Sequence, residues 1–298
     1  MKINVSNSAL ELSRIVQGMM RLNQWNFSVK ETENFILKAI DLGVTTFDHA
    51  DIYGNYTCES LFGEVLKNNP SLRSKIQIVT KTGIVLPNKE KRRIHYYDTT
   101  KSHIINSVDQ SLKNLNTDFI DLLLIHRPDP LMDPMEIAEA FIELHKSGKV
   151  LYFGVSNFSI QQFKTLQSKL SIPIVTNQIE LSPYNLEHFQ NDNIYFLLEK
   201  NVNPMVWSPL AGGKLFDATN EKSIRILTAL KEVAQELNID KLDTIVYSWL
   251  LSHPLKVLPI SGSGKIERLK NAIEALDLQM PRELWFKIYK AGLGHDVP

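Results

Sequence analysis

Short apolar segments alternate repeatedly with longer amphipathic ones along this chain, and this pattern restricts the folds that it can adopt. The short segments, such as D-L-L-L-I at 121–125, are apolar without a two-residue alternation. That pattern is typical of strands buried on both faces of a sheet. Strands that alternate with helices usually pair in parallel through right-handed crossovers. The pattern therefore predicts an α/β fold.

About eight such strand–helix units occupy the 298 residues, which matches a closed (β/α)8 TIM barrel. Ser28 and Glu31 have the capping-box spacing that begins a helix. We predict strands at 14–17, 45–48, 76–80, 121–125, 152–156, 174–178, 204–207 and 257–260. We predict helices at 28–41, 59–68, 101–115, 134–147, 160–170, 191–200, 221–237, 241–251 and 281–291.

An open, doubly wound sheet is the competing arrangement. That fold favours a glycine-rich turn after the first strand, where this chain has only Gly18. The weakly alternating segment before the first strand predicts an N-terminal β-hairpin that caps the bottom of the barrel. Because no linker, low-complexity tract or sequence repeat divides the chain, we expect residues 1–298 to form a single barrel domain.

Composition limits the classes of partner. The 33 basic and 33 acidic residues balance, which argues against a nucleic-acid-binding surface. No apolar run approaches the length of a membrane span, and the N-terminus lacks the pattern of a signal peptide. Cys58 is the only cysteine, so the sequence offers no disulfide framework and no thiolate metal site. We expect a cytoplasmic protein, monomeric or weakly homo-oligomeric, without nucleic-acid or membrane partners.

Polar residues stand where several predicted strands end, which is where a TIM barrel carries its active site. Asp48 ends the second strand, Lys81 follows the third and His126 follows the fourth. Tyr53 lies on the loop that leaves Asp48. Taken singly, each has an ordinary structural explanation, such as a turn-capping aspartate or a loop lysine. Together at one barrel mouth, they indicate a catalytic site.

These four groups suit proton transfer to a carbonyl oxygen. A phenol, with a reference pKa of about 10, is a weak acid at neutral pH. An ammonium beside the Tyr53 oxygen would lower the pKa of the phenol, and an aspartate would keep that ammonium charged and in place. A histidine would donate a hydrogen bond to the developing oxyanion. Side chains cannot supply hydride to the carbonyl carbon, so a redox cofactor is implied.

The same residues stand in motifs that resemble the aldo-keto reductases, above all a bacterial branch known as predicted oxidoreductases. The motifs follow the family order across nearly the whole chain. They are D-H-A-D-I-Y-G at 48–54, V-T-K-T at 79–82, L-L-I-H-R-P at 123–128, G-K-V-L-Y-F-G-V-S-N-F at 148–158, N-Q-I-E-L-S-P at 177–183 and W-S-P-L-A-G-G at 207–213. The resemblance implies a barrel enzyme that reduces aldehydes or ketones with a nicotinamide cofactor.

The resemblance also implies roles for individual residues. Asp48, Tyr53, Lys81 and His126 would form the catalytic tetrad, with Tyr53 as the general acid. Trp207 would stack on the nicotinamide ring. The residues expected to hydrogen-bond the nicotinamide carboxamide or to line the pyrophosphate path are Ser156, Asn157, Gln178, Ser208 and Leu210.

The far end of the cofactor is expected on the loop P-I-S-G-S-G-K-I-E-R at 259–268. Its glycines let backbone amides approach phosphate, and the helix that follows favours anions at its N-terminus. Lys265 and Arg268 could pair with a 2′-phosphate, which favours NADP(H) over NAD(H). Asn271 is the candidate adenine contact. The other loop residues assigned to the cofactor are Ser261, Gly262 and Ser263.

Substrate contacts are expected from loops around the mouth, namely from Met19, Trp25 and Tyr56. Aromatic side chains near a nicotinamide suit aldehydes and ketones with apolar bodies. Trp25 and Tyr56 could equally serve to pack these loops onto the barrel.

Two other functions stay open on the sequence. The D-H-A-D segment at 48–51 and His126 could hold a metal ion in a hydrolase, although Lys81 beside them suits a phenol better. A barrel that binds NADP as a redox sensor, with little turnover, is the other alternative.

Overall fold

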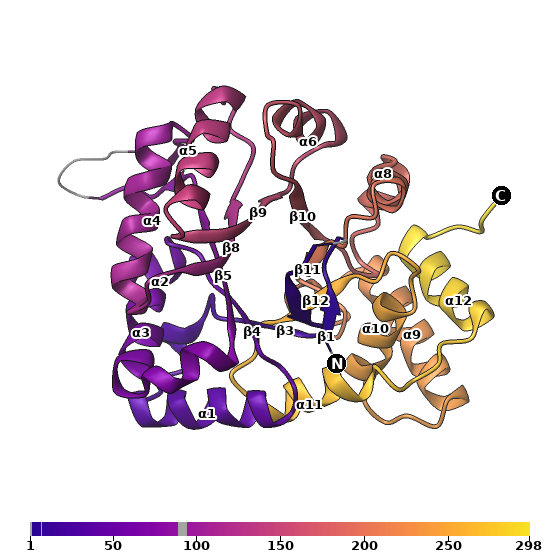
Figure 1. Ribbon diagram of the computed structural model, residues 1–298. Helices are drawn as coiled ribbons and strands as arrows, with labels where there is room; N and C mark the ends of the chain where they lie inside the picture. Colours follow the sequence, from indigo (N-terminus) through magenta and orange to yellow (C-terminus); the bar gives the residue numbers. More distant parts are fainter. Residues whose placement is uncertain (1, 7, 89–93) are drawn as a thin grey trace.

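The computed structural model describes residues 2–6, 8–88 and 94–298. Eight parallel strands close into a barrel in the order β10-β11-β12-β3-β4-β5-β8-β9 (Figure 1). The open doubly wound sheet is therefore excluded, and the predicted TIM barrel is confirmed. The barrel strands are β3 (Val16–Gly18), β4 (Thr46–Asp48), β5 (Gln77–Thr82), β8 (Ile120–Ile125), β9 (Val150–Ser156), β10 (Ile174–Glu180), β11 (Met205–Trp207) and β12 (Leu258–Ser261).

The inside of the barrel is filled by apolar side chains from successive strands, as a packed barrel core requires. Val16, Leu122, Val175 and Leu258 are among these buried residues. The N-terminal hairpin joins the same core through Leu12. Its strands, β1 (Lys2–Asn4) and β2 (Glu11–Ser13), pair antiparallel, as predicted.

The hairpin lies at the end of the barrel where the strands begin. The Ser6 hydroxyl donates to the carbonyl of Val175, at the start of β10. The Ser6 amide donates to Asn203 Oδ1, just before β11. Because the hairpin covers this end, the opposite, carboxyl end of the strands is left to form a site.

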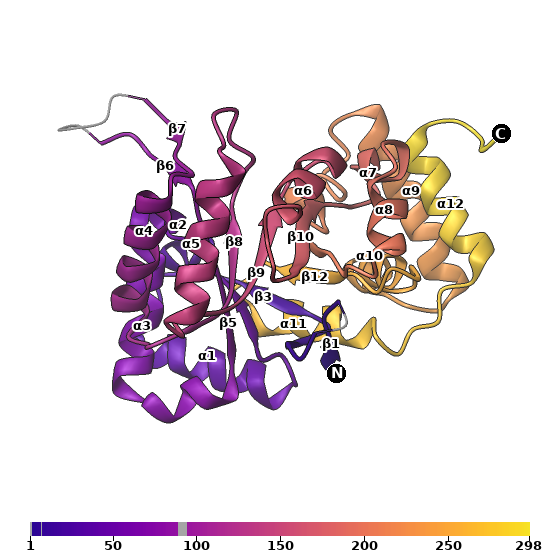
Figure 2. The same cartoon turned by 45° about the horizontal axis from the view of Figure 1, so that its top comes forward.

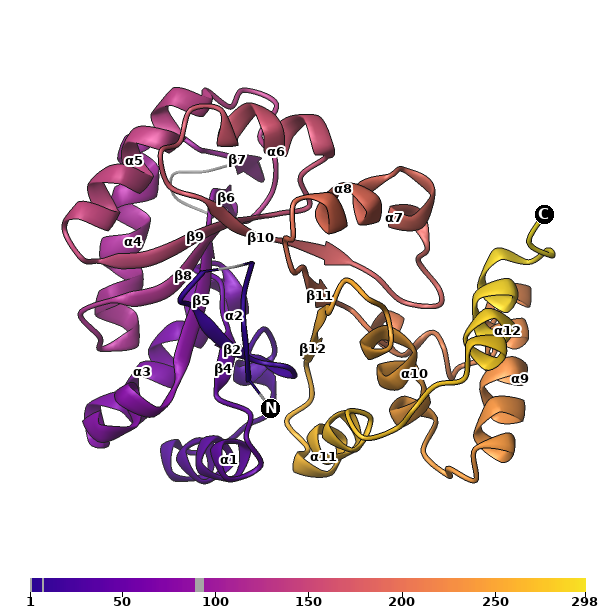
Figure 3. The ribbon, with the colours of Figure 1, turned by 45° about the vertical axis from the view of Figure 1, so that its right-hand side comes forward.

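Helices surround the barrel and bury their apolar faces against it. Figure 3 shows α9 and α12 side by side, and these two helices are in direct contact. The longer helices are α1 (Val29–Asp41), α3 (Cys58–Asn68), α4 (Lys101–Leu115), α5 (Pro134–Lys146), α6 (Ile160–Gln167), α8 (Asn193–Glu199), α9 (Glu221–Glu236), α10 (Leu242–Leu251), α11 (Ile266–Glu274) and α12 (Arg282–Leu293). The shorter ones are α2 (Tyr53–Tyr56) and α7 (Glu187–Gln190), with 3-10 turns η1 (Leu22–Gln24), η2 (Pro70–Lys75) and η3 (Ala211–Gly213).

The helix starts and strand ends agree with the predictions to within a few residues, with instructive exceptions. Ser28 accepts from the Glu31 amide in the predicted capping box. β5 extends to Thr82, so Lys81 lies within a strand instead of after it, because Lys81 and Thr82 pair with Leu124 and Ile125 of β8. The predicted helix at 191–200 begins later, since Asp192 adopts a left-handed conformation and separates α7 from α8.

A second small hairpin extends from the carboxyl end of β5. Its strands, β6 (Ile84–Val85) and β7 (Tyr96–Tyr97), project away from the barrel in Figure 2. Within the described ranges, no helix combines the length and apolar character needed to cross a bilayer.

The contact between α3 and α4 depends on Gly63. A Cβ atom added there would lie 1.9 Å from the backbone oxygen of Asn114. We predict that Gly63→Ala lowers the free energy of unfolding by about 1–3 kcal/mol, because overpacking forces the helices apart. Urea denaturation would measure this. Lys67→Ala, an exposed change on the same helix, is the control and should cost less than about 0.5 kcal/mol. Equal stability of the two variants would contradict the predicted steric clash.

Candidate active site

A fully buried lysine organises the carboxyl end of the barrel. Lys81 on β5 is 0% exposed. Its ammonium lies 2.8 Å from each carboxylate oxygen of Asp48, at the end of β4, and 2.7 Å from the backbone oxygen of His49. It also lies 3.1 Å from the hydroxyl of Tyr53. The structure therefore brings together three members of the tetrad that the sequence predicted.

Tyr53 is held by a sharp turn immediately after it. Gly54 and Asn55 both have left-handed backbone angles inside the short helix α2. Gly54 is required there for a second reason, because a Cβ would lie 2.6 Å from the sulfur of Cys58. The turn fixes the phenol against Lys81, so its orientation follows from local backbone geometry as well as from the hydrogen bond.

His126, directly after β8, completes the cluster. Its ring meets the Tyr53 ring edge-on, with the centroids 5.9 Å apart. Burial, with smaller effects of Lys81 and Arg127, holds the pKa of His126 well below its ordinary value. A neutral imidazole is therefore the form present at physiological pH. Its buried Nδ1 has no hydrogen-bond partner within the described residues.

Burial and neighbouring charges act in opposite directions on the pKa values of the Tyr53 phenol and the Lys81 ammonium. Burial would lower the pKa of Lys81, but Asp48 and Tyr53 together raise it above its ordinary value. Burial raises the pKa of Tyr53, and the Lys81 ammonium only partly opposes this. Lys81 thus lowers the pKa of the phenol as expected, but burial outweighs this effect and leaves the pKa above its ordinary value. The phenol keeps its proton, and the lysine keeps its charge.

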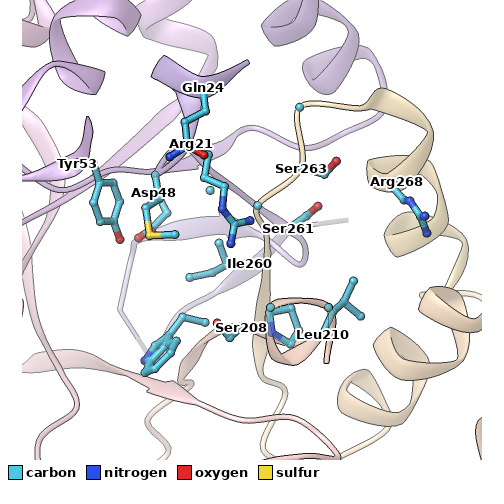
Figure 4. Close-up of a pocket in the computed structure, with 18 of the residues that line it drawn as sticks. Arg21, Gln24, Asp48, Tyr53, Ser208, Leu210, Ile260, Ser261, Ser263 and Arg268 are labelled. Carbon is cyan, nitrogen blue, oxygen red and sulfur yellow. The ribbon is translucent and has the colours of Figure 1, made fainter. Parts of the chain in front are cut away.

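A large cavity opens beside these groups. It has a volume of about 1070 Å³, and its wall includes His126 as well as Asp48 and Tyr53. Figure 4 shows the last two of these side chains at one side of the cavity. Arg268 lies at the other side of the same cavity in that view. A single continuous space therefore connects the tetrad to the loop after β12.

Three strand ends next to the tetrad are linked by hydrogen bonds. The Trp207 indole N–H donates to Asn157 Oδ1 over 2.9 Å, and the Asn157 amide donates to Ser156 Oγ over 2.7 Å. The Gln178 amide donates to Asp48 Oδ1 over 2.9 Å. All four predicted residues line the cavity, as do Ser208 and Leu210. Sequence reasoning did not foresee that Gln178 would be tied to Asp48.

The loop between β12 and α11 forms the other wall, with Ser261, Gly262, Ser263 and Lys265 on it. Arg268 Nη1 lies 2.8 Å from Asp243 Oδ2. Asn271, whose contact with adenine stays a prediction, is not among the residues that line the cavity. Its amide donates to both oxygens of Asp243, over 3.1 and 3.0 Å, and thus orients that carboxylate from behind the cavity wall.

The predicted substrate contacts need larger corrections. Met19 is 0% exposed in the core beneath α1 and α3, and the neighbouring Met20 lines the cavity instead. Tyr56 points elsewhere, and its hydroxyl accepts from the Leu86 amide over 2.9 Å. Trp25 does line the cavity, but its indole packs against Gly264, where a Cβ would lie 2.6 Å from the ring.

Several lining residues were missed by sequence reasoning. Arg21 and Gln24 come from the loop after β3, and Asp243 and Tyr247 come from α10. Arg127 also lines the cavity, with its guanidinium carbon 5.4 Å from the Trp207 ring centroid. Listing every charged residue within a few positions of each strand end would have found Arg21. The α10 residues carry no such signal.

The alternative of a metal site gains no support from geometry. In the described part of the chain, no three or more His, Cys, Asp or Glu side chains are grouped so as to hold a metal ion. Asp48, the candidate carboxylate ligand, is already engaged by Lys81 and Gln178.

Comparison with known proteins identifies the class that this barrel and site define. The model of the Aldo/keto reductase family matches residues 14–291. The chain therefore belongs to the aldo/keto reductase family, and it is an oxidoreductase in class.

Individual relatives refine the comparison. The chain is 53% identical to the oxidoreductase YcsN of Bacillus subtilis, with 97% of each chain covered. It is 50% identical to the oxidoreductase YdhF of Escherichia coli, covering 100% of this chain and 99% of that one. A 6-dehydroglucose reductase of Agrobacterium fabrum is 44% identical, with 97% of each covered.

The fold also matches a solved structure. A thermostable aldo-keto reductase, Tm1743, in complex with the inhibitor epalrestat, superposes with a TM-score of 0.81. The match covers 98% of this chain and 100% of that chain at 24% identity. At that identity the likeness supports the fold, which agrees with the barrel described above.

The lowered pKa of His49, which lies beside the tetrad, can be tested by the pH dependence of stability. Burial, reinforced by Lys81, lowers the pKa of His49 to about 3. Below about pH 6.5, the unfolded chain binds a proton that the folded chain does not, so stability falls as the pH falls through this window. We predict that His49→Leu removes up to about 1.4 kcal/mol of this loss per pH unit. Urea denaturation at pH 7, 6 and 5 would measure it, and identical pH slopes in both proteins would contradict the assignment.

Proposed function

We propose that this protein reduces aldehydes or ketones to alcohols with NADP(H), using Tyr53 as the general acid. The observation that carries the proposal is the 3.1 Å hydrogen bond between the Tyr53 hydroxyl and the buried Lys81 ammonium, at the edge of a cavity. Membership of the aldo/keto reductase family supports the same reaction class.

The residues present fit a nicotinamide dinucleotide. The cavity of about 1070 Å³ extends from the tetrad to the β12–α11 loop, whose Gly262 leaves backbone exposed on its wall. The N-terminus of α11 follows this loop and favours an anionic group. Trp207 offers an aromatic surface on the tetrad side. The bound cofactor would supply hydride to the carbonyl carbon.

Each tetrad residue would then have a distinct task. Tyr53, protonated at rest, would donate its proton to the carbonyl oxygen as negative charge develops there. Lys81 would stabilise the phenolate that remains, and Asp48 would hold the ammonium in place. His126, kept neutral by burial, would donate a hydrogen bond to the substrate oxygen. Solvent would return the proton to Tyr53 after release.

The preference for NADP(H) would come from the far end of the cavity. Lys265 and Arg268 both line it and could pair with a 2′-phosphate. Arg268 is 57% exposed despite its contact with Asp243, so part of its guanidinium is open to a ligand. Asp243 would thus position the arginine for the phosphate.

The relatives suggest a first substrate to test. Because one relative is named a 6-dehydroglucose reductase, we propose polyhydroxylated aldehydes beside simpler aldehydes and ketones. We further propose a single-domain cytoplasmic enzyme, monomeric or weakly associated. Its one cysteine is buried, which is compatible with a reducing compartment.

Removing the proton donor tests the mechanism. Tyr53→Phe should lower kcat for carbonyl reduction by about 10²–10⁴-fold, the usual contribution of a positioned general acid. The Kd for NADPH, followed by fluorescence titration, should stay within about twofold. Tyr56→Phe is the matched control, because its hydroxyl bonds Leu86 outside the tetrad, and it should keep full turnover. Retained turnover in Tyr53→Phe would refute the assigned role. NADPH binding by the wild type without turnover on any carbonyl would favour the redox-sensor alternative.

Cofactor preference is tested at Arg268. Arg268→Gln should weaken NADPH binding by about 10–100-fold, as expected for a lost charge-assisted contact. NADH has no 2′-phosphate, so its Kd should change by less than about twofold. Lys270→Gln, on the same helix and paired with Glu267, is the control and should change neither. Isothermal titration calorimetry would measure the Kd of each dinucleotide. Equal weakening of NADPH and NADH would overturn the 2′-phosphate assignment.

A further inference from the structure

Arg21 projects into the middle of the cavity, although no motif pointed to it. It lies on the loop between β3 and α1, beside the short turn η1, and its side chain is exposed. Figure 4 shows its guanidinium between Tyr53 and Asp48 on one side and Ser261 and Arg268 on the other. It thus occupies a central position between the two ends of the cavity.

Arg21 faces the backbone of the β12–α11 loop. Its Nη1 lies 3.8 Å from the position that a Cβ would occupy on Gly262. Because Gly262 has no side chain, nothing but backbone separates the guanidinium from this part of the loop. A ligand oxygen beside this contact could accept hydrogen bonds from both the guanidinium and the backbone amides of the loop.

The two loops are held against each other on both sides of Arg21. Trp25 packs on Gly264 so closely that a Cβ there would meet its ring at 2.6 Å. Gln17, within β3 and four residues before Arg21, donates its side-chain amide to the Ser263 carbonyl over 3.2 Å. The position of Arg21 over Gly262 is therefore built into the packing of the β3–α1 loop.

The charge of Arg21 is not neutralised by the acids of the cavity. Asp48 is paired with Lys81, and Asp243 is paired with Arg268. Within the part of the chain that the structure describes, no carboxylate lies within ion-pair distance of Arg21. A cation facing a glycine-containing loop and a helix N-terminus makes this part of the cavity favourable for a polyanion.

We propose that Arg21 binds the diphosphate bridge of the dinucleotide from the β3–α1 loop. The inference rests on the proposed nicotinamide cofactor. A dinucleotide with its nicotinamide beside Tyr53 and its adenosine phosphate beside Arg268 would carry its diphosphate between them, where Arg21 lies. Arg21 would supply charge, and the adjacent loop amides around Gly262 would supply hydrogen bonds to the same group.

The location favours the cofactor over an anionic substrate. Arg21 faces Gly262, on the loop that leads to α11 and Arg268. A substrate anion close to the reacting carbonyl would instead be met by Arg127, whose guanidinium lies over Trp207 next to the tetrad. Arg21 is thus assigned to a group that every nicotinamide dinucleotide shares, whereas Arg268 is assigned to one that only NADP(H) carries.

The test compares the affinities of NADPH, NADH and 2′-AMP for the wild type and its variants by isothermal titration calorimetry. Arg21→Gln should weaken NADPH and NADH by the same factor, about tenfold or more, because both contain the diphosphate. Binding of 2′-AMP, which lacks the diphosphate, should change by less than about twofold. Arg268→Gln should give the opposite pattern, with weaker NADPH and 2′-AMP and unchanged NADH. Arg21→Lys should recover part of the loss, since it keeps the charge without the fork.

The outcomes separate the inference from the function on which it rests. Failure of the wild type to bind either dinucleotide would overturn the proposed function itself. Wild-type affinity of Arg21→Gln for both dinucleotides would overturn only the diphosphate assignment. Loss of NADPH alone, or an unchanged cofactor Kd with a raised KM for anionic carbonyls, would also overturn it. Arg21 is exposed, so an unchanged thermal unfolding midpoint is expected and would show that the variant is folded.

Discussion

The buried ion pair between Lys81 and Asp48 is the interaction on which the site depends. Removing an ammonium from water is unfavourable by several kcal/mol, so a fully buried lysine needs close compensation. Asp48, the His49 carbonyl and the Tyr53 hydroxyl provide it, all within 3.1 Å. These contacts join β4, β5 and the turn at Gly54. The requirement to satisfy one buried charge therefore fixes the geometry that the proposed chemistry uses.

The acidic side chains in the wall of the cavity are also paired. Each acid in its wall is held by a specific cation, since Asp48 faces Lys81 and Asp243 faces Arg268. Arg21 lies between these two pairs. The cavity therefore offers a neutralised reactive end and a positive middle, an arrangement that suits a polyanionic cofactor better than a cationic ligand.

The sequence predicted a residue's position correctly where a short apolar run marked the strand that carries it. Asp48 and His126 were placed correctly, because each directly follows a short apolar run. The prediction failed for side chains on loops, because a loop has no periodic pattern that indicates where each side chain points. Met19 and Met20 are adjacent and chemically identical, so no pattern distinguished the core residue from the cavity residue. Tyr56 has a left-handed backbone angle of 68°, which turns it toward Leu86.

The amino-acid sequence alone was enough to predict the barrel and its family, and to place the four predicted tetrad residues at one end of it. Parallel strands bring their carboxyl ends to one face whatever the details of packing. The electrostatic effects of these groups on one another follow from the folded structure. Burial, which depends on the whole packed barrel, raises the pKa of Tyr53 against the pull of Lys81. Closure of the barrel between β3 and β12 also brings Arg21 to Gly262, a contact between distant parts of the chain that no local pattern encodes.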